Sequence, residues 1–153
     1  MGDRWQISAP VLIRSISHRF ILMANILLTE DDDAVRSFVA RALEMEGHTL
    51  TLAEDGEDGF DKLQEAEGQF DLLLTDIKMP FMDGIELARL SASLYPGLRI
   101  LFMTGFADQR ERTGDLADIV IDVVSKPFTL AQIKLAVSHA LEVETSADLK
   151  EAS

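Results

Sequence analysis

The residues of this sequence best suited to chemistry are acids, one hydroxyl and one amine, each placed directly after a short apolar run. Glu30 and Asp31 follow one such run, and Asp76, Thr104 and Lys126 each follow or end another. Carboxylates brought together repel one another unless a cation holds them, and hard oxygen ligands favour Mg²⁺. Asp76 is therefore predicted to be a carboxylate nucleophile that accepts a phosphoryl group, with Lys126 and Thr104 contacting the oxygens of that group.

Each of these residues also has a purely structural interpretation. Asp32 and Asp33 fit the N-terminal cap of a helix at least as well as a metal site. An aspartate after a strand often forms a turn, a threonine before glycine often caps, and a lysine before proline is often only solvated. Because the reactive types follow successive apolar runs in order, the functional interpretation is favoured for Glu30, Asp31, Asp76, Thr104 and Lys126.

The apolar runs themselves predict the elements that position these residues. Leu72, Leu73 and Leu74 are consecutive, which is typical of a strand buried on both faces of a parallel sheet. Apolar runs alternate with amphipathic stretches along the chain, which predicts repeated βα units in an α/β fold with a doubly wound, five-stranded parallel sheet. Strands are expected at 25–29, 50–52, 70–75, 100–103 and 119–124. Helices are expected at 35–46, 60–66, 85–94, 130–141 and, with weak periodicity, 107–118.

Composition narrows the possible functions. The 153 residues carry a formal charge of −13 and are 47% hydrophobic, so the chain has enough apolar residues for one folded domain. This acidity argues against binding to nucleic acid, which requires clustered lysine and arginine. The sequence has no cysteine, which excludes a thiol nucleophile and a thiolate metal site and is compatible with the cytoplasm.

The two ends differ from the middle of the chain. Residues 1–22 contain three arginines and one aspartate, with no clean signal-peptide core and no apolar stretch long enough to span a membrane. We expect a loose extension here, or an upstream in-frame start, since Met23 reads as a natural beginning. Residues 23–143 are expected to form the domain, and residues 144–153 a polar tail.

Four motifs resemble one known family. TEDD at 29–32, LLLTDIKMPFMDG at 72–84, MTG at 103–105 and SKPF at 125–128 are similar to the receiver domains of bacterial two-component response regulators. The resemblance covers residues 24–143. It implies a flavodoxin-like sheet with strand order 2-1-3-4-5 and a cis peptide bond before Pro127.

The resemblance also implies roles for individual residues. Asp76 would be the phosphoacceptor, Thr104 the switch residue and Lys126 the contact to the phosphoryl oxygens. Glu30, Asp31, Asp76 and the backbone carbonyl of Lys78 would bind Mg²⁺. The phosphoryl group would come from a phosphohistidine on a sensor histidine kinase or a histidine phosphotransfer protein. Such a protein is a signalling phosphoacceptor rather than an enzyme.

A narrower resemblance is to stand-alone alphaproteobacterial receivers that regulate proteolysis in the cell cycle. It implies an ATP-dependent protease, or an adaptor of one, as the downstream partner. One departure from the family is Val123, where many receivers carry an aromatic residue that moves with the switch threonine. Output is therefore expected through loop or backbone changes near Thr104 and residues 107–118.

An alternative function belongs to a different class of protein. Residues 31–35 read D-x-D-x-V after a strand, as in haloacid-dehalogenase-type phosphatases, and this would make Asp31 the nucleophile. Such enzymes need further acids on a strand end after their lysine, whereas the acids after Lys126 fall in the last helix or the tail. A third alternative, an interaction module with a degenerate site, fits poorly because every key residue is present.

Overall fold

The structure is a computed structural model that describes residues 23–105 and 116–143. The extension at 1–22, the tail at 144–153 and residues 107–115 of the expected short helix lie outside the described residues. The described elements are β1 (Asn25–Thr29), α2 (Asp33–Met45), β2 (Thr49–Ala53), α3 (Gly56–Glu65), β3 (Leu72–Asp76), α4 (Gly84–Leu94), β4 (Arg99–Thr104), β5 (Asp122–Ser125) and α6 (Leu130–Glu142).

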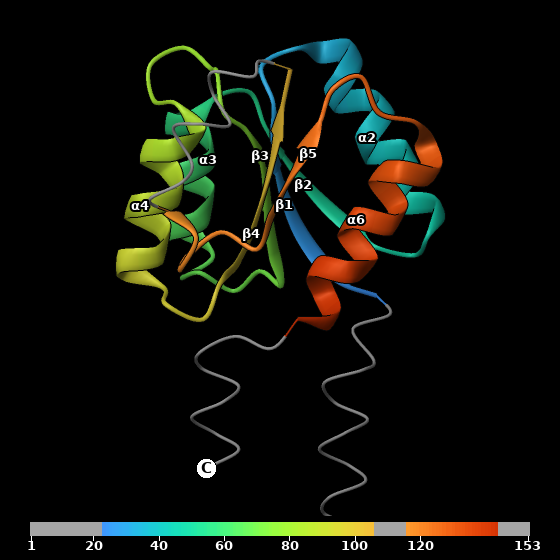
Figure 1. Cartoon of the computed structure of the whole chain (residues 1–153). Coiled ribbons are helices and arrows are strands. Elements are labelled where there is room, and N and C mark those ends of the chain that lie inside the picture. Colours follow the sequence, from blue (N-terminus) through green and yellow to red (C-terminus); the bar gives the residue numbers. More distant parts are fainter. Residues whose placement is uncertain (1–22, 106–115, 144–153) are drawn as a thin grey trace, which may run out of the picture.

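All five strands are parallel and lie in the order β2-β1-β3-β4-β5, as the sequence predicts. Figure 1 shows α3 and α4 on one face of the sheet and α2 and α6 on the other, so the doubly wound arrangement is confirmed. Because the strands are parallel, their carboxyl ends meet at one edge, where ligands bind in open α/β sheets.

Two apolar cores explain why the strands read as continuous hydrophobic runs. Successive side chains of a strand point to opposite faces, so Leu27 and Leu73 pack under α3 and α4, while Leu28 and Leu74 pack under α2 and α6. All four leucines are completely buried. Burial on both faces fixes the positions of the strands, and therefore the positions of the residues at their carboxyl ends.

Four of the five strands differ in their bounds from the sequence-based expectation, and the largest differences are in the third and the fifth. The third strand, expected at 70–75, spans Leu72–Asp76, and the fifth, expected at 119–124, spans Asp122–Ser125. Ahead of β5, the backbone N–H groups of Ile119 and Val120 both donate to the carbonyl of Leu116, at 2.9 Å each, which makes a turn. Local turns thus replace strand pairing at apolar positions that propensity alone assigns to strands.

Aspartates cap three of the helices at the carboxyl edge of the sheet. The Asp32 side chain accepts from the backbone of Ala34 and Val35, which confirms its capping interpretation, and Asp55 and Asp83 cap α3 and α4 in the same way. These acids satisfy backbone N–H groups at the start of each helix. They are therefore part of the scaffold rather than of the reactive set.

Glycine at position 84 brings the start of α4 against the end of β3. A Cβ atom at Gly84 would lie 2.0 Å from the carbonyl oxygen of Asp76, well inside van der Waals contact. The Gly84 N–H donates to the carbonyl of Ile77 at 2.7 Å. The loop from Ile77 to Asp83 is thereby fixed at both ends. No helix in the part of the chain that the structure describes is long and apolar enough to cross a membrane.

Candidate acidic site at the carboxyl edge

Three acids from two neighbouring strands meet at the carboxyl edge. Glu30 and Asp31 follow β1 and Asp76 ends β3, and one carboxylate oxygen of each lies within 4.8 Å of the others. Glu30 is completely buried and Asp76 is 7% exposed, whereas Asp31 faces solvent. The structure therefore brings together the three acids that were predicted from the sequence, in a geometry that a small cation fits.

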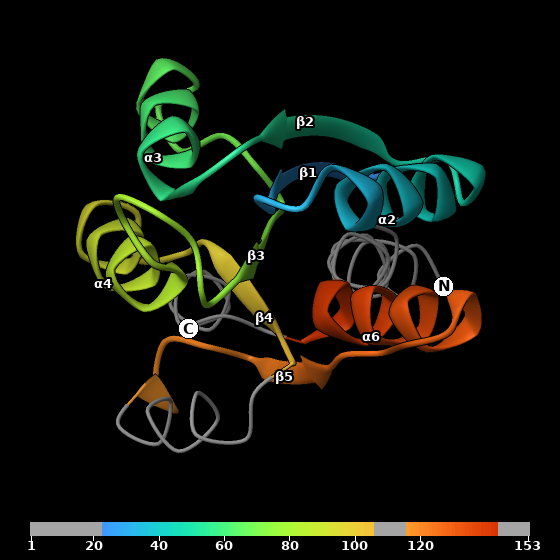
Figure 2. The ribbon, with the colours of Figure 1, turned by 90° about the horizontal axis from the view of Figure 1, so that it is seen from above.

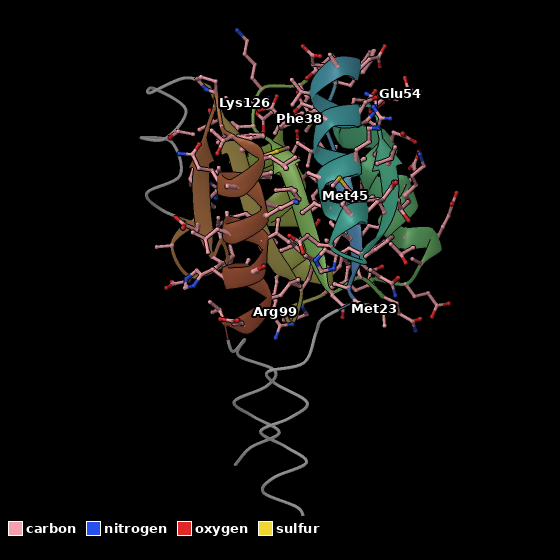
Figure 3. All side chains as sticks on the ribbon, turned by 90° about the vertical axis from the view of Figure 1, so that its right-hand side faces the viewer. Met23, Phe38, Met45, Glu54, Arg99 and Lys126 are labelled. Carbon is pink, nitrogen blue, oxygen red and sulfur yellow. The ribbon has the colours of Figure 1, made fainter. Side chains whose placement is uncertain are left out.

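Lys126 connects the two buried acids. Its Nζ atom lies 3.0 Å from Oε1 and 3.2 Å from Oε2 of Glu30, and 3.2 Å from Oδ2 of Asp76. The lysine follows β5, so its side chain spans from the edge of the sheet to the middle strands; Figure 3 shows it at the upper end of the sheet. Lys126 therefore contacts two of the three gathered carboxylates, and acids held this close together favour an additional cation.

The electrostatics of this cluster appear in two shifted pKa values. Burial, together with the nearby charge of Asp76, raises the pKa of Glu30 from 4.5 to about 7, although Lys126 opposes the rise. For Lys126, burial lowers the pKa, but the charges of Asp76 and Glu30 outweigh burial and raise it overall. The lysine stays protonated, and Glu30 is readily protonated when no other cation balances it.

Backbone groups orient the Asp76 side chain. The N–H of Ile77 donates to Oδ1 of Asp76 at 2.8 Å, and Oδ2 faces Lys126. The hydroxyl of Thr75 donates to the Asp76 carbonyl at 2.9 Å, on the same carbonyl that Gly84 approaches. With one oxygen bonded to the backbone and the other beside a cation, the Asp76 carboxylate has a defined direction at the edge.

Thr104 and Lys126 come from adjacent strands and are joined through the backbone. The N–H of Lys126 donates to the carbonyl of Thr104 at 2.7 Å, and Thr104 pairs with Ser125 in the sheet register. Thr104 is 2% exposed. The peptide bond between Lys126 and Pro127 is cis, as expected. Lys78 is exposed in the loop two residues after Asp76.

An apolar groove of about 520 Å³ opens beside Lys126. Phe38 of α2 and Phe128 form part of its wall, with ring centroids 6.4 Å apart. The groove places hydrophobic surface directly next to the charged cluster. It is lined by Ala34, Val35, Phe38, Gly105, Lys126, Pro127 and Phe128.

The family model for the response regulator receiver domain matches residues 26–138, which is most of the chain. The chain belongs to the response regulator receiver domain family. The receiver is 45% identical over 111 residues to the response regulator receiver protein CpdR of Brucella abortus, covering 72% of this chain and 91% of CpdR. It is also 34% identical to part of the sensor kinase CckA of Brucella abortus, covering 78% of this chain but only 13% of that protein.

A solved structure of the same family resembles the receiver in fold. The response regulator protein TrrA from Thermotoga maritima, solved in complex with Mg²⁺-BeF, superimposes with a TM-score of 0.69 at 27% identity. The match covers 77% of this chain and 99% of TrrA.

Sequence reasoning missed one side chain of the receiver that supports the acidic cluster. Nη1 of Arg36 donates to the carbonyl of Glu30 at 2.7 Å, and Nη2 forms an ion pair with Asp33. Arg36 thereby ties the first turn of α2 to the residue that precedes Asp31. The spacing of Asp33 and Arg36, three residues apart on a helix, was the available signal, but it pointed only to a surface ion pair.

Proposed function

We propose that this receiver accepts a phosphoryl group on Asp76 from a phosphohistidine of a sensor histidine kinase or histidine phosphotransfer protein, in the cytoplasm. Phosphorylation would then change its contacts with other proteins. The observation that carries the proposal is the position of Asp76, between the ammonium group of Lys126 and the carboxylates of Glu30 and Asp31. Such a carboxylate is oriented, partly accessible and next to groups that neutralise phosphoryl charge.

The same residues fit a Mg²⁺ ion. Carboxylate oxygens of Glu30, Asp31 and Asp76 lie within 4.8 Å of one another, and Mg²⁺ prefers a few hard oxygen ligands together with water. The backbone carbonyl of Lys78, in the loop after Asp76, is the further ligand in this proposal. The complex of TrrA with Mg²⁺-BeF supports the assignment. When bound, the ion would neutralise charge on the transferring phosphoryl oxygens.

The residues of the receiver have separate tasks in the transfer. A carboxylate oxygen of Asp76 forms a bond to phosphorus while the phosphorus–nitrogen bond of the phosphohistidine breaks, and the leaving imidazole keeps that electron pair. Lys126 provides positive charge for the phosphoryl oxygens, and the Thr104 hydroxyl donates a hydrogen bond to one of them. The acyl phosphate remains on the protein, so the receiver is a phosphoacceptor rather than a catalyst that releases a product.

The direct test is intact-mass measurement after incubation with Mg²⁺ and acetyl phosphate. We expect the wild type to gain one phosphoryl group and Asp76→Asn to gain none. Asp71→Asn is a matched control, because Asp71 precedes β3 and its side chain accepts from the Asn25 N–H at 2.8 Å, at the other end of the strand. Loss of the adduct only in Asp31→Asn would instead favour the phosphatase mechanism, and no adduct with any phosphodonor would favour a degenerate interaction module.

On the narrower resemblance of the sequence we extend the proposal to regulated proteolysis in the cell cycle. The downstream partner would be an ATP-dependent protease or its adaptor. The 45% identity to CpdR supports a partner shared with such receivers. Pull-down with the wild type and with Asp76→Ala, each with and without Mg²⁺ and acetyl phosphate, tests this extension. Capture of neither kind of protein in any phosphorylation state would contradict it.

A further inference from the structure

The loop between β3 and α4 contains a phenylalanine in an unfavourable backbone conformation. Phe81 has φ of +69°, in the left-handed region that side chains with a Cβ rarely adopt. The N–H of Met82 donates to the carbonyl of Pro80 at 2.8 Å, so Phe81 is the central residue of a tight three-residue turn. Glycine adopts this conformation readily and is the residue expected there on backbone grounds alone.

The ring of Phe81 is stabilised little by packing against the rest of the receiver. The residue is 81% exposed, so its side chain is not buried in either core. Phe38 differs, because it lies in a regular helix and packs against the ring of Phe128. Glu67 also has positive φ within residues 23–105 and 116–143, but it comes at the end of α3 directly before Gly68, where such a conformation is common. Phe81 therefore has neither a packing role nor a helix-ending role.

The loop holds the exposed ring at a fixed place relative to Asp76. The Ile77 N–H donates to the Asp76 side chain, and Gly84 closes the loop onto the Ile77 carbonyl. On its other side the loop touches α3, where a Cβ at Gly56 would lie 2.0 Å from the Met82 carbonyl oxygen. Figures 1 and 2 show this loop at the carboxyl edge of the sheet, in the connection from β3 to α4. The backbone of the loop thus places Phe81 on the rim of the acidic site.

We infer that Phe81 is a docking contact for the protein that carries the phosphohistidine. This inference rests on the proposed function, because it concerns how the phosphoryl group reaches Asp76. Asp76 is 7% exposed, so a donor side chain must enter over the rim, and the protein surface around that donor then meets the loop. A large apolar ring that becomes buried at such a contact is typical of residues that dominate binding. A small donor such as acetyl phosphate makes no such contact.

The experiment compares the two kinds of donor. The protein donor is the histidine kinase or phosphotransfer protein of the same genome that labels the wild type fastest in a phosphotransfer profile. Transfer from this protein and from acetyl phosphate is measured for Phe81→Ala, Phe81→Gly and Phe81→Tyr. Leu94→Ala is the matched control, since Leu94 is a 51% exposed apolar residue at the far end of α4.

We expect Phe81→Ala and Phe81→Gly to lower kcat/KM for the protein donor about tenfold or more, as for a residue central to an interface. Their labelling by acetyl phosphate should be unchanged, and Phe81→Tyr and Leu94→Ala should resemble the wild type with both donors. Phe81→Gly should also keep or raise the thermal midpoint, by roughly 2–4 °C, because the backbone conformation suits glycine. Loss of transfer in a variant that is no less stable separates docking from folding.

Three results would overturn the inference. The first is an unchanged rate from the protein donor in Phe81→Ala. The second is equal loss with both donors, because the ring would then shape the site itself. The third is that acetyl phosphate labels Asp76 of the wild type, whereas no phosphohistidine protein does. In all three cases Asp76 remains a phosphoacceptor, although the third case removes the phosphohistidine as its donor. Absence of any adduct on Asp76 from any donor would instead remove the phosphoacceptor role itself.

Discussion

The two edges of the sheet carry polar side chains that are satisfied in different ways. At the amino edge, Nδ1 of His48 accepts from the Ala24 N–H at 3.0 Å, and Nε of Arg99 donates to the Val143 carbonyl at 3.1 Å. At the carboxyl edge, Lys126 contacts the charged side chains of Glu30 and Asp76. Figure 3 shows Arg99 and Lys126 at these opposite ends.

The difference separates structural polar groups from functional ones. At the amino edge, the side chains of His48 and Arg99 each form a hydrogen bond with a backbone group. At the carboxyl edge three carboxylates lie within 4.8 Å of one another and repel, which favours a further cation or a proton there. A strand-end residue of the same chemical type can therefore be inert at one edge and reactive at the other, according to what surrounds it.

Removing the lysine should give the largest effect. Lys126→Met leaves Glu30 and Asp76 without their shared cation, so we expect the free energy of unfolding in EDTA to fall by about 3 kcal/mol. Mg²⁺ should restore part of this loss, since it supplies positive charge at the same place. Arg99→Met, at the amino edge, should lower the free energy of unfolding by less, and Mg²⁺ should not change that decrease. Urea unfolding with and without Mg²⁺ measures both; equal Mg²⁺ responses would contradict the comparison.

Glu30 should make the stability of the metal-free receiver fall as pH rises. Burial raises the pKa of Glu30 in the folded state from 4.5 to about 7, so the folded form binds a proton that the unfolded chain has released. The stabilisation is complete below about pH 4.5 and is lost as the pH rises through about 7. The difference between wild type and Glu30→Gln should change by at most about 3 kcal/mol over this window. Urea unfolding in EDTA from pH 4.5 to pH 8 measures it, and a constant difference would show that Glu30 does not titrate there.

Thr104 should affect the response to phosphorylation more than phosphorylation itself. Thr104→Ala removes a buried hydroxyl but leaves the Asp76 carboxylate, so intact mass should still show the proposed adduct. The loss of one hydrogen bond to the phosphoryl group is worth about 1 kcal/mol. Hydrogen exchange near Gly105 and Lys126 should differ between phosphorylated and unphosphorylated wild type, and this difference should shrink in the variant. An undiminished difference would remove the switch role.

Substitution of His48 should give the smallest effect on stability, and its dependence on pH should be opposite to that of Glu30. Burial lowers the pKa of His48 in the folded state, although Glu46 and Asp71 oppose this. Its contribution to stability is therefore present above the ordinary value of 6.5 and is lost as the pH falls below it. Stability of wild type relative to His48→Gln should decline toward acid pH, whereas relative to Glu30→Gln it should improve. Urea unfolding of the three proteins tests whether the two edges have opposite slopes.

The pattern of residues predicted the parallel sheet and the gathering of Glu30, Asp31, Asp76, Thr104 and Lys126 at one edge. These features depend on apolar periodicity and on the position of each residue relative to a strand end. Both are local properties that can be recognised in the sequence. The cap at Asp32 was equally readable, because capping depends on the next three residues. The family resemblance supplied the strand order, which periodicity alone leaves open.

Other parts of the site depended on contacts that sequence spacing does not encode. The Ile77 N–H that orients Asp76 is a backbone group, which every residue except proline has, so no residue type marks it. The bond from Arg36 to the Glu30 carbonyl depends on how α2 sits on the sheet. The left-handed conformation of Phe81 is set by the loop that Gly84 closes. A phenylalanine in the sequence predicts the opposite, because bulky residues rarely adopt a positive φ.

The close approach of Gly84 to Asp76 has a genetic consequence. Every missense mutation of a glycine codon introduces a Cβ atom, and at this position the atom would lie 2.0 Å from the Asp76 carbonyl oxygen. No replacement, however small, avoids the clash unless the strand or the helix moves. Codon 84 should therefore tolerate only synonymous changes in a saturation library selected for function, although its side chain takes no part in the chemistry.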